Sequence, residues 1–284
     1  MTEVAYQGEP GAFGEEAVIG WFGADATPKP MPTFSAVCAA VESGSTDAGV
    51  LPLENSLAGT VGDALDALAV GSLRVVGEVL LPIRHQLLAL PGTELAAIER
   101  VSSHWQALAQ CERFLSAHSW QVIPAADTAG AARELAASLD PRAAAIASRA
   151  AAERYGLEVL AADIHDSDHN MTRFAVLVRA DGELPPPAGP LAPVGGGRET
   201  LLTFETGHRP GDLYRALGAL ADAGINLSRI ESRPSGDGPW RYRFLIQVAG
   251  NAAAEPLRGA LIGLRQHTSS MRVLGSFDVA SGDH

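Results

Sequence analysis

The stretch ADGELPPPAGPLAPVGGGRE, residues 180–199, decides how the chain is divided. Its prolines, from Pro185 to Pro193, precede the glycine run Gly195–Gly197. Prolines hold a spacer extended and consecutive glycines loosen its end, which is the composition of a linker rather than of a core. We therefore predict one domain at residues 1–180, a linker at 181–197 and a second domain at 198–284.

Ahead of the linker, short β-rich runs alternate with helical stretches rich in alanine and leucine. Runs of the first kind lie at 4–7, 48–51 and 73–81, and stretches of the second kind lie at 12–22, 105–115 and 128–139. This alternation predicts a layered α/β fold with mainly parallel strands.

Behind the linker, the pattern changes to strand, helix, strand, strand, helix, strand between residues 200 and 279. Six elements in this order within fewer than 90 residues predict a ferredoxin-like (βαββαβ) α+β domain.

Composition narrows the classes of function. The chain has 284 residues, a formal net charge of −12 and no long basic run, so binding to nucleic acid or to an anionic membrane surface is not expected. Cys38 and Cys111 stand alone, which argues against a disulfide framework or a cysteine zinc site. The N-terminus lacks a signal-peptide pattern and no apolar run reaches 18 residues, so we expect a cytoplasmic protein.

Four loops share one design, in which a strand ends, small or polar residues follow and a helix begins. They lie at 7–16, 53–65, 102–110 and 126–135. The unpaired N–H groups and partial positive charge of a helix start attract anions, and such loops gather at the carboxyl ends of strands. Any one of Asn55, Ser103 and Thr128 is equally well an ordinary helix cap, but four such loops together favour a small anionic ligand.

The stretch HDSDHNMTRF, residues 165–174, places polar groups directly before an apolar strand. The spacing of His165 and His169 permits a metal site, although a turn-forming sequence without cysteine favours structural or solvated histidines. Thr172 and Arg173 stand at the strand entrance, where a rigid element holds side chains at a cleft edge. From the pattern alone, a β-forming threonine and a surface arginine remain the alternative.

Several of these segments resemble one enzyme family. The N-x-T-R-F pattern of Asn170–Phe174, the stretch PLENSLAGTV (52–61) and the stretch SSHWQALAQC (102–111) are similar to motifs of prephenate dehydratases. Behind the linker, RPGDLYRAL (209–217) and INLSRIESRP (225–234) resemble phenylalanine-sensing motifs of ACT regulatory domains. The resemblance covers nearly the whole chain outside the linker and the termini.

The chain departs from the family pattern at three places. Gly11–Gly14 lack two hydroxyls of the family's G-T-F-S stretch, Trp105 replaces a proline, and Asp212 replaces an alanine. A carboxylate at 212 would repel the carboxylate of a bound amino acid. No chorismate mutase segment precedes Val4, so a bifunctional fusion is not expected.

The resemblance implies a two-lobed catalytic domain like that of periplasmic binding proteins, followed by an ACT domain. It implies conversion of prephenate to phenylpyruvate with loss of water and CO2, without metal or cofactor. It also implies regulation by L-phenylalanine and a homodimer or homotetramer that pairs through the ACT domain. Arogenate dehydratase and a non-catalytic amino-acid sensor are the alternatives.

Residue roles follow from the matching motifs. We expect Thr172 to be the catalytic hydroxyl and Asn55 and Gln110 to be catalytic amides. The expected substrate-binding residues are Phe13, Glu54, Ser56, Ser103, His104, Gln106, Arg173 and Phe174. Arg173 or the helix start at 103–106 would hold the pyruvyl carboxylate, and Phe13 or Phe174 would face the ring carboxylate. The expected effector-binding residues are Gly211, Asp212, Leu213, Asn226, Leu227, Glu231, Ser232, Arg233 and Pro234.

Overall fold

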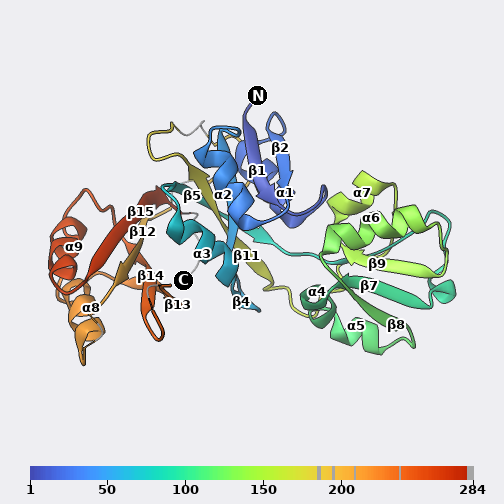
Figure 1. Ribbon diagram of the computed structural model, residues 1–284. Helices are drawn as coiled ribbons and strands as arrows, with labels where there is room; N and C mark the ends of the chain where they lie inside the picture. Colours follow the sequence, from blue (N-terminus) through green and yellow to red (C-terminus); the bar gives the residue numbers. More distant parts are fainter. Residues whose placement is uncertain (184–186, 194–195, 208, 237, 280–284) are drawn as a thin grey trace.

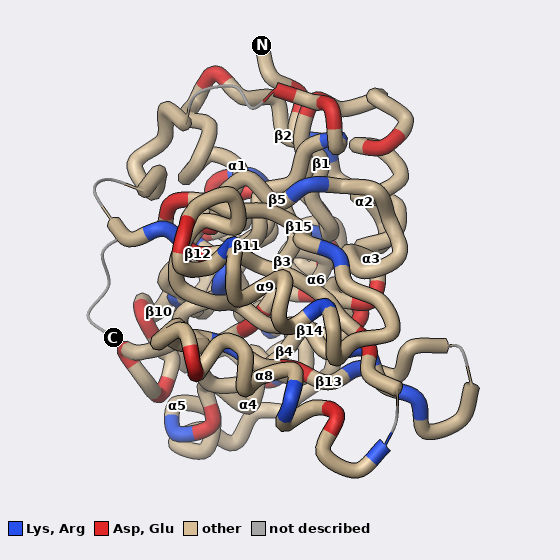
Figure 2. Tube along the Cα trace, turned by 90° about the vertical axis from the view of Figure 1, so that its left-hand side faces the viewer, with Lys and Arg blue, Asp and Glu red and all other residues tan. Residues whose placement is uncertain are grey.

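The computed structural model describes residues 1–183, 187–193, 196–207, 209–236 and 238–279, which form two α/β lobes and a C-terminal α+β domain (Figure 1). Lys and Arg are interspersed with Asp and Glu along the described trace (Figure 2). In these residues no helix is both long and apolar enough to span a membrane.

Lobe one is a sheet with helices on both faces. Its strands, in the order β2-β1-β3-β11-β5, are β2 (Thr27–Met31), β1 (Glu3–Gln7), β3 (Ala48–Asn55), β11 (Met171–Val178) and β5 (Arg74–Pro82), and β4 (Gly59–Thr60) pairs with β3. Helix α1 (Phe13–Phe22) packs on one face around Trp21 and Phe174. Helices α2 (Phe34–Glu42) and α3 (Gly62–Val70) pack on the other face around Leu51 and Leu177.

Lobe two is a second sheet, and the chain crosses between the lobes twice. Its strands, in the order β10-β6-β9-β7-β8, are β10 (Glu158–Ala161), β6 (Gln86–Ala89), β9 (Ala143–Ala147), β7 (Arg100–His104) and β8 (Gln121–Ala125). Its helices are η1 (Leu95–Ala97), α4 (Trp105–Ala109), α5 (Glu112–Ser116), α6 (Thr128–Ser138) and α7 (Arg149–Tyr155). The crossovers are residues 83–85, from β5 to β6, and residues 162–170, from β10 to β11.

The prediction of mainly parallel strands is wrong, because both lobes have mixed sheets. β1 is parallel to β2 and β3, but β11 is antiparallel to both β3 and β5. In lobe two β6 is antiparallel to β9 and β10, whereas β7 is parallel to β8 and β9. The strands that follow a crossover enter their sheet from the other lobe, without the helical connection that a parallel strand requires.

The C-terminal domain confirms the predicted βαββαβ order. Its elements are β12 (Arg198–Glu205), α8 (Asp212–Asp222), β13 (Leu227–Pro234), β14 (Tyr242–Ala249), α9 (Leu257–Gln266) and β15 (Ser270–Asp278), with the strand order β13-β14-β12-β15. Both helices cover one face of this sheet. The other face packs on lobe one (Figure 1). There Leu245 and Phe277 share a core with Leu177.

The linker is partly fixed to lobe one. The backbone N–H groups of Ala188 and Gly189 donate to the carbonyl of Trp21, and Leu191 packs against the core beneath α1. Residues 184–186 and 194–195, which include Pro185, Pro186 and Gly195, lie outside the described residues. The described part of the linker is therefore attached to α1 rather than a free spacer.

Candidate active site

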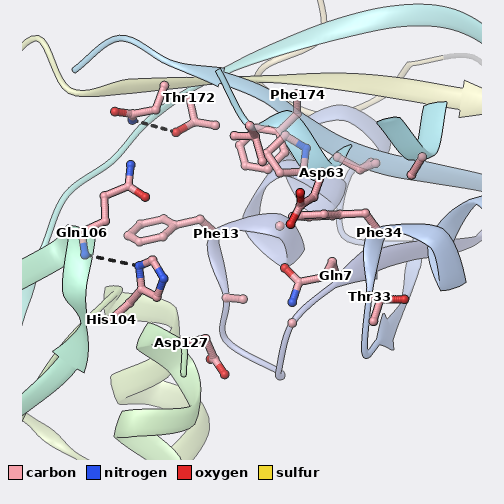
Figure 3. A pocket seen from close by; sticks show the side chains of 18 of the residues that line it. Gln7, Phe13, Thr33, Phe34, Asp63, His104, Gln106, Asp127, Thr172 and Phe174 are labelled. Atoms are coloured by element: carbon pink, nitrogen blue, oxygen red, sulfur yellow. Dashed lines mark hydrogen bonds between the residues drawn. The ribbon is translucent and has the colours of Figure 1, made fainter. Parts of the chain in front are cut away.

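A cleft of about 1300 Å³ is lined by both lobes, and each of the four predicted loops contributes to it. Lobe one supplies Phe13 and Thr172 and lobe two supplies His104 and Gln106, with the ring of Phe13 between Thr172 and His104 (Figure 3). The cleft continues along α2 and α3 past Asp63. The described lining residues include no Lys or Arg, so an anionic ligand must be held there by neutral donors and helix starts.

The three predicted catalytic residues are brought together across the lobes. Asn55 Nδ2 donates to Thr172 Oγ1 over 3.0 Å (Figure 3), and Gln110 Nε2 donates to Asn55 Oδ1 over 3.3 Å. Thr172 is 8% exposed and Asn55 is 5% exposed. Asn55 and Thr172 are directly opposite each other on the paired strands β3 and β11. Both hydrogen-bonded groups therefore sit on rigid elements at the edge of the cleft.

Two backbone amides determine how the Asn55 side chain is oriented. The N–H groups of Leu57 and Ala58 donate to Asn55 Oδ1 over 3.1 and 2.9 Å. A backbone N–H is always a donor, so the oxygen of Asn55 must lie on that side and its NH2 group must face Thr172. Thr172 Oγ1 consequently accepts a hydrogen bond, and among the described residues its own proton has no acceptor. That proton is available to a ligand.

Two residues of this network, His85 and Asn170, were absent from the predicted site. They lie on the two crossovers between the lobes. His85 Nε2 and Asn170 Nδ2 both contact Gln110 Oε1 over 2.9 Å, and Asn170 Oδ1 accepts from Asn55 Nδ2 over 2.8 Å. Asn170 stands within the N-x-T-R-F pattern, so that pattern could have pointed to it. No motif marks His85.

Four of the predicted substrate-binding residues line the cleft: Phe13, His104, Gln106 and Phe174. His104 Nδ1 accepts from the backbone N–H of Gln106 over 3.4 Å, which caps α4 and orients the imidazole. Burial lowers the pKa of His104, and the nearby carboxylate of Asp127 opposes this. Burial thus favours the neutral form of His104.

The structure corrects the placement of Arg173. Side chains alternate along a strand, so Thr172 and Phe174 face the cleft while Arg173 projects from the opposite face of the sheet. There Arg173 Nη1 lies 3.4 Å from Glu78 Oε1, beneath the ACT domain. Burial raises the pKa of Glu78, and the Arg173 guanidinium opposes that rise. Arg173 therefore does not line the cleft as expected, and a role for it in holding the substrate stays a prediction.

Glu54, Ser56 and Ser103 also do not line the cleft. Glu54 precedes Asn55 on β3 and faces the buried Arg229, with 3.6 Å between Oε2 and Nε. The hydroxyl of Ser56 donates to the carbonyl of His169 over 2.6 Å, and that of the fully buried Ser103 donates to the carbonyl of Ile146 over 2.6 Å. These groups hold the loops around the cleft in place.

The histidines of the 165–174 stretch do not share a site. The side chain of His165 is 3% exposed, with Nε2 3.6 Å from Asp168, whereas His169 is exposed. Among the described residues no group of three or more potential metal ligands is found.

The predicted effector residues fall at two ends of the ACT sheet. By strand register, Arg233 lies opposite Arg243, which lies opposite Glu205 at the end of β12. The α8 start and the Glu231–Pro234 segment are therefore toward one end, and Asn226 and Leu227 are at the other. These nine residues are Gly211, Asp212, Leu213, Asn226, Leu227, Glu231, Ser232, Arg233 and Pro234.

Two of these residues contact lobe one. Arg233 forms two hydrogen bonds of 3.0 and 2.6 Å with the carboxylate of Asp66, and Glu231 accepts from the hydroxyl of Thr60. Asp212 is paired with Arg215 over 2.6 Å, which offsets the repulsion expected of its carboxylate. A role of Glu231 and Arg233 in effector binding stays a prediction.

The fold and the cleft together define a ligand-binding protein of two α/β lobes, with a C-terminal α+β domain packed on one of the lobes. A family model described as prephenate dehydratase matches residues 4–182, and one described as ACT domain matches residues 200–265. The chain belongs to the prephenate dehydratase family.

Named relatives agree with this membership. The chain is 38% identical to a bifunctional chorismate mutase/prephenate dehydratase of Aquifex aeolicus, over 98% of this chain and 74% of that protein. It is 39% identical to an arogenate dehydratase/prephenate dehydratase of Arabidopsis thaliana, over 98% and 73%. The solved structure of an Arthrobacter aurescens prephenate dehydratase in complex with L-Phe is 36% identical over 97% and 90% of the two chains, with a TM-score of 0.87.

Proposed function

We propose that the protein converts prephenate to phenylpyruvate, water and CO2. The observation that carries this proposal is the orientation of Thr172. Its hydroxyl accepts from Asn55 Nδ2 over 3.0 Å and keeps its proton for the cleft. This is the group that an elimination with a poor leaving group requires.

The reaction needs one proton. When the ring carboxylate departs as CO2, the electron pair of its carbon–carbon bond enters the ring and expels the hydroxyl on the opposite ring carbon. The hydroxyl must take up a proton to leave as water, and the ring becomes aromatic. A positioned proton donor typically accelerates such a step by about 10² to 10⁴-fold. Thr172 supplies the proton, and His104, which lies across the Phe13 ring in the same cleft, is a candidate for returning one to Thr172 through intervening water.

The two carboxylates of prephenate require different treatment. Strong stabilisation of the ring carboxylate would favour the ground state, whereas the pyruvyl carboxylate survives and can be held tightly. Arg173 projects from the other face of the sheet. The Gln106 side chain, at the predicted 103–106 helix start, lines the cleft and is the donor that we assign to the pyruvyl carboxylate. Phe13 and Phe174 provide the apolar surroundings for the carboxylate that leaves.

Arogenate is the second candidate substrate, and the charge of the cleft favours it. Arogenate carries an ammonium group where prephenate has a keto group. The described lining has the acidic residues Glu42, Asp63, Asp66 and Asp127 and no Lys or Arg. A carboxylate within reach of the side chain would attract the ammonium group.

The deciding experiment supplies purified protein with prephenate and with arogenate in parallel. Phenylpyruvate is followed by its absorbance, and phenylalanine by chromatography. A higher kcat/KM for prephenate supports the proposal, and a higher value for arogenate selects the second candidate. No turnover of either would refute the enzymatic function and leave the non-catalytic sensor.

We further propose that L-phenylalanine regulates the enzyme through paired ACT domains. The predicted effector residues at 226–227 and 232–234 lie at opposite ends of the edge strand β13. Seven residue steps along a strand span about 23 Å, too far for one amino acid. If two chains paired antiparallel along β13, residues 226–227 of one chain would lie next to residues 232–234 of the other. Titrating phenylalanine against activity and oligomer size tests this, and no response in either would reject it.

A further inference from the structure

The side-chain amide of Gln110 is the point where lobe two joins the catalytic network. Gln110 belongs to the end of α4, whereas its partners Asn55 and Asn170 belong to β3 and the second crossover. An amide side chain can present either its oxygen or its nitrogen to the cleft, and these have opposite chemical meaning for a substrate oxygen. What determines the orientation of Gln110 therefore matters for the proposed reaction.

The orientation follows from the Asn55 side chain. Asn55 Oδ1 is fixed as an acceptor by the backbone N–H groups of Leu57 and Ala58. The Gln110 group that faces Asn55 Oδ1 over 3.3 Å must therefore be the NH2 group. Gln110 Oε1 then lies toward the crossovers, where it accepts from Asn170 Nδ2 over 2.9 Å.

The same argument determines the tautomer of His85. Its Nε2 lies 2.9 Å from Gln110 Oε1, which can only accept, so Nε2 must carry the hydrogen. The ring is 2% exposed, it packs edge-on against Phe13 with 5.6 Å between centroids, and its Nδ1 has no partner among the described residues. Burial lowers the pKa of His85, in agreement with a neutral ring.

We propose that His85 is a positioning residue that holds Gln110 with its N–H toward the substrate. With both donors on Gln110 Oε1, the nitrogen of Gln110 keeps one hydrogen for Asn55 and one for the cleft that Gln110 lines. The N–H of Gln110 then donates a hydrogen bond to an oxygen of the substrate. If the amide were flipped, its oxygen would face the substrate oxygen instead, and two acceptors would repel each other. This inference rests on the proposed dehydratase function.

A matched pair of variants tests the role. In His85→Gln the amide nitrogen reaches about as far as Nε2 and keeps a donor for Gln110, whereas His85→Asn has the same chemistry but is one methylene too short. With prephenate we expect His85→Gln to keep kcat within about threefold and His85→Asn to lose about tenfold, the typical effect of one neutral hydrogen bond. KM should change by less than about twofold in both variants, because we expect the oriented Gln110 amide to stabilise the transition state more than the bound substrate.

A double-mutant cycle separates positioning from a general structural role. In a Gln110→Ala background the His85→Asn substitution should lower kcat no further, because the group that it positions is absent. Equal losses in His85→Gln and His85→Asn would overturn the proposal. So would losses of His85→Asn and Gln110→Ala that multiply.

Nitrogen NMR on the histidine-labelled wild-type protein tests the geometry without any substrate. The signal lost in His85→Gln identifies the ring, and at pH 7 its Nε2 should be protonated and its Nδ1 bare. A protonated Nδ1 would refute the assignment. Because this measurement does not depend on turnover, it distinguishes a failure of this inference from a failure of the proposed reaction.

Discussion

Replacing Thr172 with valine removes the hydroxyl while keeping the shape of the side chain. Asn55 Nδ2 would lose one acceptor but keep two others, Asn170 Oδ1 at 2.8 Å and the carbonyl of Met171 at 3.1 Å. The free energy of unfolding should therefore fall by no more than about 1 kcal/mol, the net contribution of one hydrogen bond.

The kinetic effect should be much larger. If Thr172 donates the proton to the leaving hydroxyl, its loss should lower kcat by about 10² to 10⁴-fold. Each factor of ten corresponds to about 1.4 kcal/mol, so the barrier should rise by about 3 to 5.5 kcal/mol. Thr172→Val thus separates catalysis from stability, because the two expected effects differ several-fold.

The assay measures phenylpyruvate formation from prephenate under saturating substrate, with urea unfolding of each variant in parallel. Thr172→Ser is the control, since it keeps the hydroxyl and deletes one methyl group. It should retain activity within about tenfold although it costs about 1 kcal/mol of stability. A Thr172→Val enzyme with more than a tenth of the wild-type kcat would refute the role of Thr172. So would a serine variant as slow as the valine variant.

Three further predictions concern residues at the contacts between the two lobes and between lobe one and the ACT domain. Gly11 has φ +87°, and a Cβ added there would lie 2.7 Å from Ala151 Cα in lobe two. Gly11→Ala should therefore lower the free energy of unfolding, measured by urea titration, by about 1–3 kcal/mol. An unchanged urea midpoint would contradict this. Burial raises the pKa of Glu16 from its ordinary 4.5 to about 6, so the buried carboxylate costs stability above pH 6 and the cost vanishes below pH 4.5. Glu16→Gln should therefore raise the free energy of unfolding by about 2 kcal/mol at pH 8 and leave it unchanged at pH 4, and the reverse pH dependence would exclude this cause. Arg229 is 6% exposed and donates from Nη2 to the carbonyl of Leu53 over 2.9 Å, so it ties the ACT domain to the strand that carries Asn55. In Arg229→Met the affinity for phenylalanine, measured by calorimetry, should stay within about threefold, while the effect of bound phenylalanine on kcat should become smaller. An undiminished effect of phenylalanine on kcat would show that the signal takes another route.

Features that depend on neighbouring residues were predictable from the sequence. The βαββαβ order behind the linker follows from hydrophobic periodicity, which each segment carries by itself. The contribution of all four helix-start loops to the cleft follows from the strand-loop-helix pattern. The expected network members Thr172, Asn55 and Gln110 came from local motifs that resemble the family, and they do hydrogen-bond to one another.

Features that depend on pairing between distant residues were not predictable. Nothing local shows that β11 returns antiparallel between β3 and β5, or that residues 187–193 lie against α1. Thr172 and Arg173 are adjacent in the chain, yet the pleat sends one to the cleft and the other to Glu78.

Only the tertiary structure decided which polar groups act together. His85, Asn55 and Gln110 are far apart in sequence. Which of their atoms donate and which accept is determined by the backbone N–H groups of Leu57 and Ala58, which donate to Asn55 Oδ1. By itself the sequence determined the elements and the candidate side chains, because short-range periodicity and turn chemistry act within a few residues. The directions of those side chains depend on strand register and lobe crossovers, and these exist only once the chain has folded.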